Sequence, residues 1–149
     1  MSVNTYIIRD ECQERLVELI SAPDGVEVLD NEPRDWMQDG IFVADTVGTI
    51  SYPVQAYGLI PRDDEFSIVV VCVARHPADT AREAKARVQS YAQAVMEAVS
   101  VGTGPTLGDL PGVFDATISN VDGPDALPAA EGYAAVMTVT VDVHTRITL

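Results

Sequence analysis

The stretch EFSIVVVCVAR, residues 65–75, gives the clearest strand signal in the sequence. Its alternate positions place one apolar set on one face: Phe66, Ile68, Val70, Cys72 and Ala74. The intervening Val69, Val71 and Val73 make the other face apolar as well. Because strands of this kind are typical of buried positions, we expect residues 65–75 to lie at the centre of a sheet, covered on both sides.

The most regular alternation lies towards the end of the sequence, and it predicts a long strand with one buried and one polar face. The apolar set is Tyr133, Ala135, Met137, Val139, Val141, Val143 and Ile147, and the polar set is Thr138, Thr140, Asp142, His144 and Arg146. Shorter strands are predicted at 26–29, 41–44 and 113–121. Pro53 marks 49–59 as an edge strand or a bulge, and residues 122–125 (DGPD) predict a turn.

Two segments have the apolar spacing of amphipathic helices. Residues 4–21 place Ile8, Cys12, Leu16, Leu19 and Ile20 on one face, with Asn4 as a possible N-cap. Residues 80–99 open with a capping box, Thr80 and Glu83, and carry a buried stripe made of Ala84, Val88, Tyr91, Ala92, Val95 and Val99. The glycine-rich residues 102–112 predict a connector.

This order of elements predicts the α+β class, with a mostly antiparallel mixed sheet of about five strands and two main helices packed against it. The chain has 149 residues, of which 47% are hydrophobic, so a single domain over 1–149 can fill its own core. No apolar run approaches the length of a membrane helix, and the N-terminus lacks a signal-peptide pattern. We therefore expect a soluble protein made in a cytoplasm.

The formal net charge of −14 predicts that free nucleic acid is repelled. One basic cluster stands out, formed by Arg82, Lys85 and Arg87 at the start of the second helix. Its charges are either neutralised by carboxylates of the same chain or dock an acidic surface of a neighbouring subunit.

An acidic segment, residues 24–45, contains Asp30, Glu32 and Asp35 next to Trp36. An aromatic side chain in such a segment is either part of the core or an exposed anchor for a partner. Since the contacts of a ring join two different surfaces of one subunit, the basic cluster and this segment are candidate complementary patches.

The sequence shows no constellation that carries chemistry, so we expect no catalytic, cofactor or metal site. Cys12 and Cys72 fall on apolar faces, where a thiol acts as a small buried hydrophobe. His76 and His144 lie near the ends of different strands, and the acidic segment lacks the regular loop of a calcium-binding hand.

The order of these elements resembles the tail terminator, or tail-completion, proteins of long-tailed bacteriophages, particularly phages of actinobacteria. The likeness spans nearly the whole chain and lies in the N-terminal helix, the strand at 66–75, residues 82–87 (REAKAR), 105–108 (PTLG) and 146–149 (RITL). It implies a subunit of a ring, usually a hexamer, that caps the tail tube, stops its polymerisation and offers a surface for head joining. The family has no enzymatic residues.

The implied partners are further copies of the chain, the major tail-tube protein and the head–tail connector proteins, in a virion assembled in the host cytoplasm. DNA would only pass through the ring, and an acidic lumen would keep it from sticking. Two alternatives remain open: another phage neck or head-completion protein, and a regulatory α+β domain that binds a small ligand.

Overall fold

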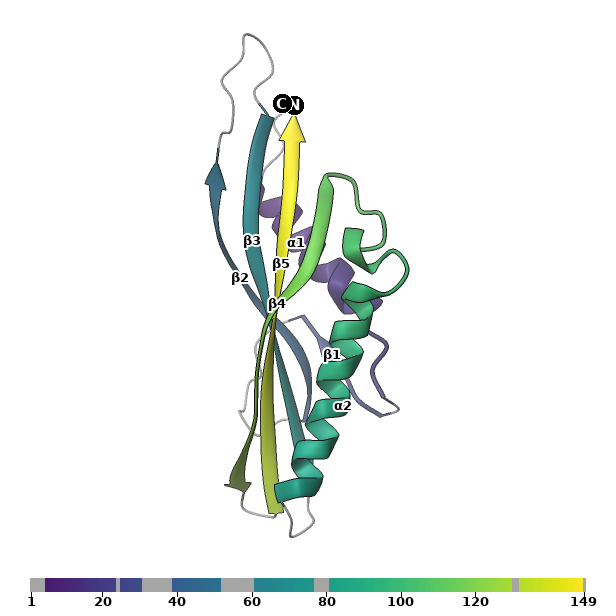
Figure 1. Ribbon diagram of the computed structural model, residues 1–149, viewed down its shortest axis with the longest axis vertical. Coiled ribbons are helices and arrows are strands. Elements are labelled where there is room, and N and C mark those ends of the chain that lie inside the picture. The colour runs from purple at the N-terminus through teal and green to yellow at the C-terminus, as the bar shows by residue number, and fades with distance from the viewer. Residues whose placement is uncertain are drawn as a thin grey trace.

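The computed structural model describes residues 5–23, 25–30, 39–51, 61–76, 81–129 and 132–148 (Figure 1). The elements are α1 (Thr5–Leu19), β1 (Val28–Leu29), β2 (Gly40–Ser51), β3 (Pro61–His76), α2 (Ala81–Ser100), the 3-10 helix η1 (Gly104–Thr106), β4 (Val113–Ala129) and β5 (Gly132–Thr148). The predicted caps Asn4 and Thr80, and also Pro53, lie outside the described residues.

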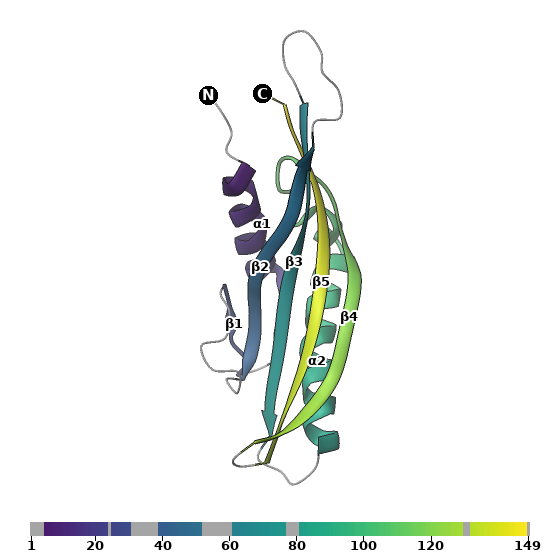
Figure 2. The ribbon, with the colours of Figure 1, turned by 90° about the vertical axis from the view of Figure 1, so that its left-hand side faces the viewer.

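The five strands form one mixed sheet in the order β1-β2-β3-β5-β4, and Figure 2 shows the long strands side by side. Short β1 pairs with β2 in parallel, and the other pairs are antiparallel. The predicted α+β class is confirmed, and so is the central position of residues 65–75, which lie within β3 between β2 and β5.

Both helices pack against the same face of the sheet, as Figures 1 and 2 show together. The core joins Leu16 of α1 and Val95 of α2 to Ile68 of β3 and its cross-strand partner Val141 of β5. The predicted stripes of both helices contribute fully buried residues, among them Cys12 and Tyr91. Burial of these apolar side chains is what holds the helices on the sheet.

The prediction that β3 is covered on both faces holds for only part of the strand, because Val73, which points away from the helices, is fully buried together with Phe42 of β2 on the same face. Val69 and Val71 point away from the helices and are only half-buried, whereas Ile68 and Val70 on the helix side are fully buried. A β-branched run therefore fits a central strand in a sheet that has helices on one side only.

Two strands, β2 and β4, continue through positions where the sequence predicted a break. The separate strands expected at 41–44 and 49–59 are parts of one strand up to Ser51, with a register shift between Val43 and Asp45. The turn predicted at 122–125 is an irregularity inside β4, because pairing with β5 resumes at Asp125. Gly123 takes a φ of 100° there, which a side chain would disfavour.

The connector predicted at 102–112 packs closely on the end of α2. A Cβ atom at Gly104 would collide with the backbone carbonyl of Ala98, so only glycine fits this approach. Leu107 follows η1 and is fully buried in the core. The connector thus fixes where β4 begins.

Candidate interaction surfaces

The sheet surface opposite the helices, here called the open sheet face, is lined by carboxylates. Strand register and alternation place five exposed acidic side chains on it: Glu65, Asp115, Asp122, Asp125 and Asp142. The one Arg or Lys side chain that the structure describes on this face is Arg75. A surface of this composition repels phosphate groups.

Hydroxyl groups hold Asp142 in place at the middle of this face. The Ser67 hydroxyl of β3 donates to Asp142 Oδ1 at 2.6 Å, and the Ser119 hydroxyl of β4 donates to the same oxygen at 3.1 Å. Nearby, Asn120 Nδ2 donates to Asp122 Oδ2 at 3.0 Å. These bonds keep Asp142 and Asp122 on the surface in defined positions.

An aromatic side chain interrupts the acidic lining near the start of β4. The register shift between Val113 and Asp115 makes Phe114 an extra residue in the strand. Its ring meets the ring of His144 edge-on, with centroids 5.4 Å apart and planes at 67°. Phe114 nevertheless stays 53% exposed, an unusual position for so apolar a side chain.

The structure divides the predicted basic cluster. All three residues, Arg82, Lys85 and Arg87, are exposed, and Arg87 in addition makes a side-chain hydrogen bond to another residue of α2. Arg87 Nε donates to the Tyr91 hydroxyl at 3.0 Å, and that hydroxyl donates to Asp39 Oδ1 at 2.7 Å. Arg87 is therefore linked through the Tyr91 hydroxyl to a carboxylate of the same chain. A carboxylate partner within the chain was one of the two alternatives that the sequence left open.

Asp39 is the acceptor that joins three elements. Its Oδ1 accepts from Tyr91 of α2, and its Oδ2 accepts the backbone N–H of Arg75 in β3 at 2.9 Å, while Gly40 starts β2 directly after it. Burial, followed by the hydrogen bond to Asp39, raises the pKa of Tyr91 to about 12. The hydrogen bond that Arg87 donates to the Tyr91 hydroxyl raises the pKa of Arg87.

Sequence reasoning included Asp39 only as one acid of the segment 24–45, and nothing in the pattern marked it as a partner of Tyr91. Of the predicted partner residues in that segment, Asp30 is exposed just after β1. Glu32, Asp35 and Trp36 lie outside the described residues, so their role stays a prediction.

The groups that could carry chemistry are dispersed. Among the described residues, no three or more His, Cys, Asp or Glu side chains gather where they could hold a metal ion. Cys12 and Cys72 are both buried, as predicted, and burial raises the pKa of Cys72 to about 12. Neither described helix has the length and apolarity of a bilayer span.

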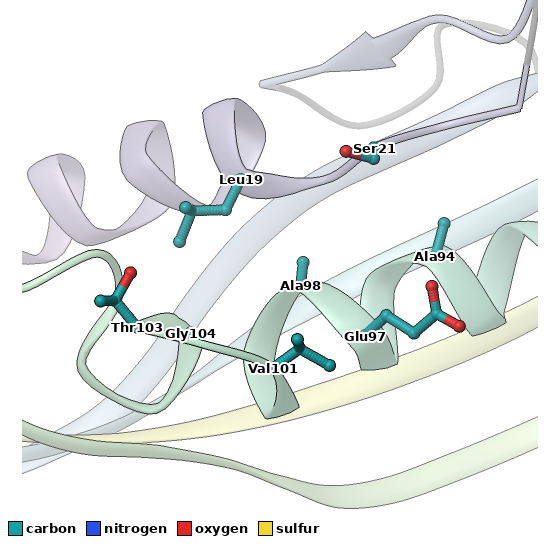
Figure 3. Close-up of a pocket in the computed structure, with 8 residues that line it drawn as sticks. All are labelled: Leu19, Ser21, Ala94, Glu97, Ala98, Val101, Thr103 and Gly104. Atoms are coloured by element: carbon teal, nitrogen blue, oxygen red, sulfur yellow. The ribbon is translucent and has the colours of Figure 1, made fainter.

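A groove of about 280 Å³ opens on the helix side, between the end of α1 and the end of α2 (Figure 3). Its lining consists of Leu19, Ser21, Ala94, Glu97, Ala98, Val101, Thr103 and Gly104. In Figure 3, Leu19 of α1 lies across the gap from Ala98 of α2. Small side chains on α2 leave this space open, and sequence reasoning did not identify it.

Compared with models of known protein families and with curated proteins, the chain matches none.

Proposed function

We propose that this chain is a non-enzymatic virion subunit, a tail terminator of a long-tailed bacteriophage. Copies of it form a ring, in the proposal a hexamer, that caps the tail tube, ends its polymerisation and provides the surface to which the head connector joins. The observation that carries this proposal is the open sheet face, a long surface that neither α1 nor α2 covers and that is lined with exposed carboxylates.

The length of the strands supports a lumen wall. β3, β4 and β5 contain 16, 17 and 17 residues, which corresponds to roughly 50 Å of strand. Figure 1 shows these strands running along the long axis of the subunit, with both helices on one side. Subunits arranged with the helices outward would surround a channel with sheet.

The charges of the open sheet face suit the passage of DNA. A carboxylate is repelled by DNA phosphates within a Debye length of about 8 Å at physiological salt. Glu65, Asp115 and Asp142 lie on neighbouring strands of that face, so they would line such a channel together. In the proposal, DNA passes through the ring without binding to it.

The other candidate class is a domain that binds a small ligand, and the groove between α1 and α2 is the feature that favours it. Its volume of about 280 Å³ lies just below the range of roughly 300–1,000 Å³ that is usual for ligand pockets. Small-molecule binding explains neither the open sheet face nor its carboxylates, so the ring subunit is the better-supported function.

A phage that carries this gene offers a direct test in cells. Interrupting the gene with a stop codon should leave tails of unregulated length and DNA-filled heads without tails, both restored by the gene supplied in trans. Electron microscopy of the lysate measures both outcomes. Normal tail lengths joined to heads would overturn the proposal.

A further inference from the structure

The two lateral edges of the subunit carry opposite charges. The β4 edge consists of β4 and the flank of α2 beside it, and the β1 edge consists of β1 and the outer flank of α1, which lies against β2 (Figure 2). Arg82 and Lys85 are exposed at the start of α2, whereas Glu27 and Asp30 are exposed on either side of β1. The basic edge of one copy and the acidic edge of another therefore attract each other.

Helix geometry places Lys85 on the β4 edge. Arg87 points towards β2, because its side chain donates to the Tyr91 hydroxyl, which is bonded to Asp39 directly before that strand. Lys85 lies two residues earlier in the helix, so it is roughly 200° around the helix axis from Arg87. Lys85 therefore faces the opposite way, towards β4.

Apolar side chains accompany the charges on both edges. Val121 of β4 lies on the helix side of the sheet with its cross-strand partner Val139, yet it stays 38% exposed. On the β1 edge, Val26 and Val28 pack against the core and are only half-buried, as is Val17 of α1. A contact between the two edges would remove both apolar sets from water.

Strand register places these apolar sets at nearly the same height along the strands. The pairing partners of Val121 lead through β5 and β3 to Val43 of β2. Val28 pairs with Ile41, two residues before Val43. Two residues of a strand correspond to about 7 Å. Copies that stand side by side with parallel long axes would therefore bring the valines of the two edges together.

The outer side of β4 is poorly suited to pairing with a further strand. Three register shifts interrupt its ladder with β5. Such bulges are a common device that prevents the addition of another strand to a sheet edge. Side chains, and not an extension of the sheet, would therefore make the contact between the edges.

We propose that the β4 edge of one copy docks on the β1 edge of the next copy, with Val121 against the valines of β1 and Lys85 beside Glu27. This inference rests on the proposed function and names the surfaces that build its ring. Both edges lie at the sides of the sheet, so joined copies keep their open sheet faces towards the lumen and their helices outward. Because the two surfaces differ, the contact can repeat around a closed ring.

Reversed charges test the pairing of Lys85 with Glu27. Lys85→Glu and Glu27→Lys should each associate roughly five- to tenfold more weakly at low salt, because each places like charges opposite each other. The variant that combines both changes should regain the association of the wild type. An equimolar mixture of the two single variants should regain it as well, since copies can then alternate around the ring. Sedimentation velocity measures the association, and circular dichroism checks folding.

The apolar part of the contact is tested with Val121→Asn, which should associate roughly tenfold more weakly than the wild type. Val101→Asn is the matched control, because Val101 is 67% exposed but lies at the groove between α1 and α2, away from both edges. It should associate like the wild type. Unaltered association of Val121→Asn, single charge variants that neither combination rescues, or a wild type that stays monomeric at millimolar concentration would overturn the contact.

Tube capping distinguishes a failure of the contact from a failure of the proposed function. Tubes that end in rings of this protein, together with unaltered association of the variants, would overturn the contact and leave the proposed function standing. Rescue by the combined charge reversal without any capping of tubes would support the contact and count against the proposed function alone.

Discussion

The hydroxyl group of Tyr91 donates a hydrogen bond to the carboxylate of Asp39 at 2.7 Å, although the two residues are 52 positions apart in the sequence. Tyr91 is 1% exposed on the buried side of α2, and Asp39 immediately precedes β2. The bond therefore links the start of β2 to α2, the helix that follows β3 in the sequence.

Replacing Tyr91 with Phe removes this bond and the acceptor for Arg87, while it keeps the aromatic ring in the core. We expect Tyr91→Phe to lower the free energy of unfolding by about 1–2 kcal/mol, because a partly buried carboxylate loses a donor. Urea denaturation measures the change. Tyr133→Phe is the matched control: Tyr133 is half-buried and has no hydrogen bond from its hydroxyl in the described part of the structure, so its loss should change the free energy by less than about 0.5 kcal/mol.

The same tyrosine predicts a pH dependence. Its pKa rises from 10.0 to about 12 in the folded protein, so the folded state holds the phenol proton more tightly than the unfolded chain does. This contribution to stability is complete below pH 10 and is lost as pH rises towards 12. The difference in unfolding free energy between wild type and Tyr91→Phe should therefore shrink over that interval. A difference that stays constant or grows would contradict the assignment.

Charge reversal tests whether the open sheet face, and not the helix side, lines the channel through which DNA passes. Asp115→Lys, Asp122→Lys and Asp142→Lys combined should reduce DNA delivery by the phage roughly tenfold or more, because a basic lumen attracts DNA. The control combines Glu11→Lys, Glu14→Lys and Glu18→Lys on exposed positions of α1, and it carries the same net charge. Plating efficiency of particles with complete tails measures the effect. Equal loss in both variants would remove the lumen assignment.

Arg82 and Lys85, the two residues of the basic cluster outside the network of Arg87, Tyr91 and Asp39, give a test of the charge-based contact predicted from the sequence. Arg82→Glu combined with Lys85→Glu should leave the unfolding free energy within about 0.5 kcal/mol, since both side chains are exposed. We expect this variant to reduce the mass of the assembled species in light scattering at low salt, where charge pairs are strongest. Arg87→Glu is a poorer probe, because it also disturbs Tyr91 and Asp39. An unchanged assembled mass would exclude Arg82 and Lys85 from the contact.

Periodicity predicted the fold well where one face of an element is buried. β5 and α2 follow their predicted alternation and stripe almost residue by residue, because burial selects apolar side chains at every second or every third to fourth position. The sequence prediction was wrong where residues typical of turns lie inside a strand. Gly123 and Pro124 are typical of a turn, yet β4 continues past them through a change of register that pairing with β5 absorbs.

The candidate surfaces were harder to predict because they depend on which segments meet. Asp39 and Tyr91 carry no shared pattern, and the groove arises because Leu19 and the small residues Ala94 and Ala98 leave a gap between α1 and α2. Both faces of β3 were predicted to be buried because Val69, Val71 and Val73 are apolar. This holds for Val73, but Val69 and Val71 are only half-buried, since apolar β-branched residues also suit the more exposed face of a central strand. An apolar composition alone does not distinguish a buried face of a central strand from a more exposed one.

The most direct test of the central claim is the length of tail tubes polymerised from the purified tail-tube protein of the same phage, with and without this protein. Negative-stain electron microscopy measures the length distribution and the structure at the tube ends. The account predicts shorter tubes in proportion to the amount added, each with a ring of this protein at one end. Tubes of unchanged length with bare ends would contradict it.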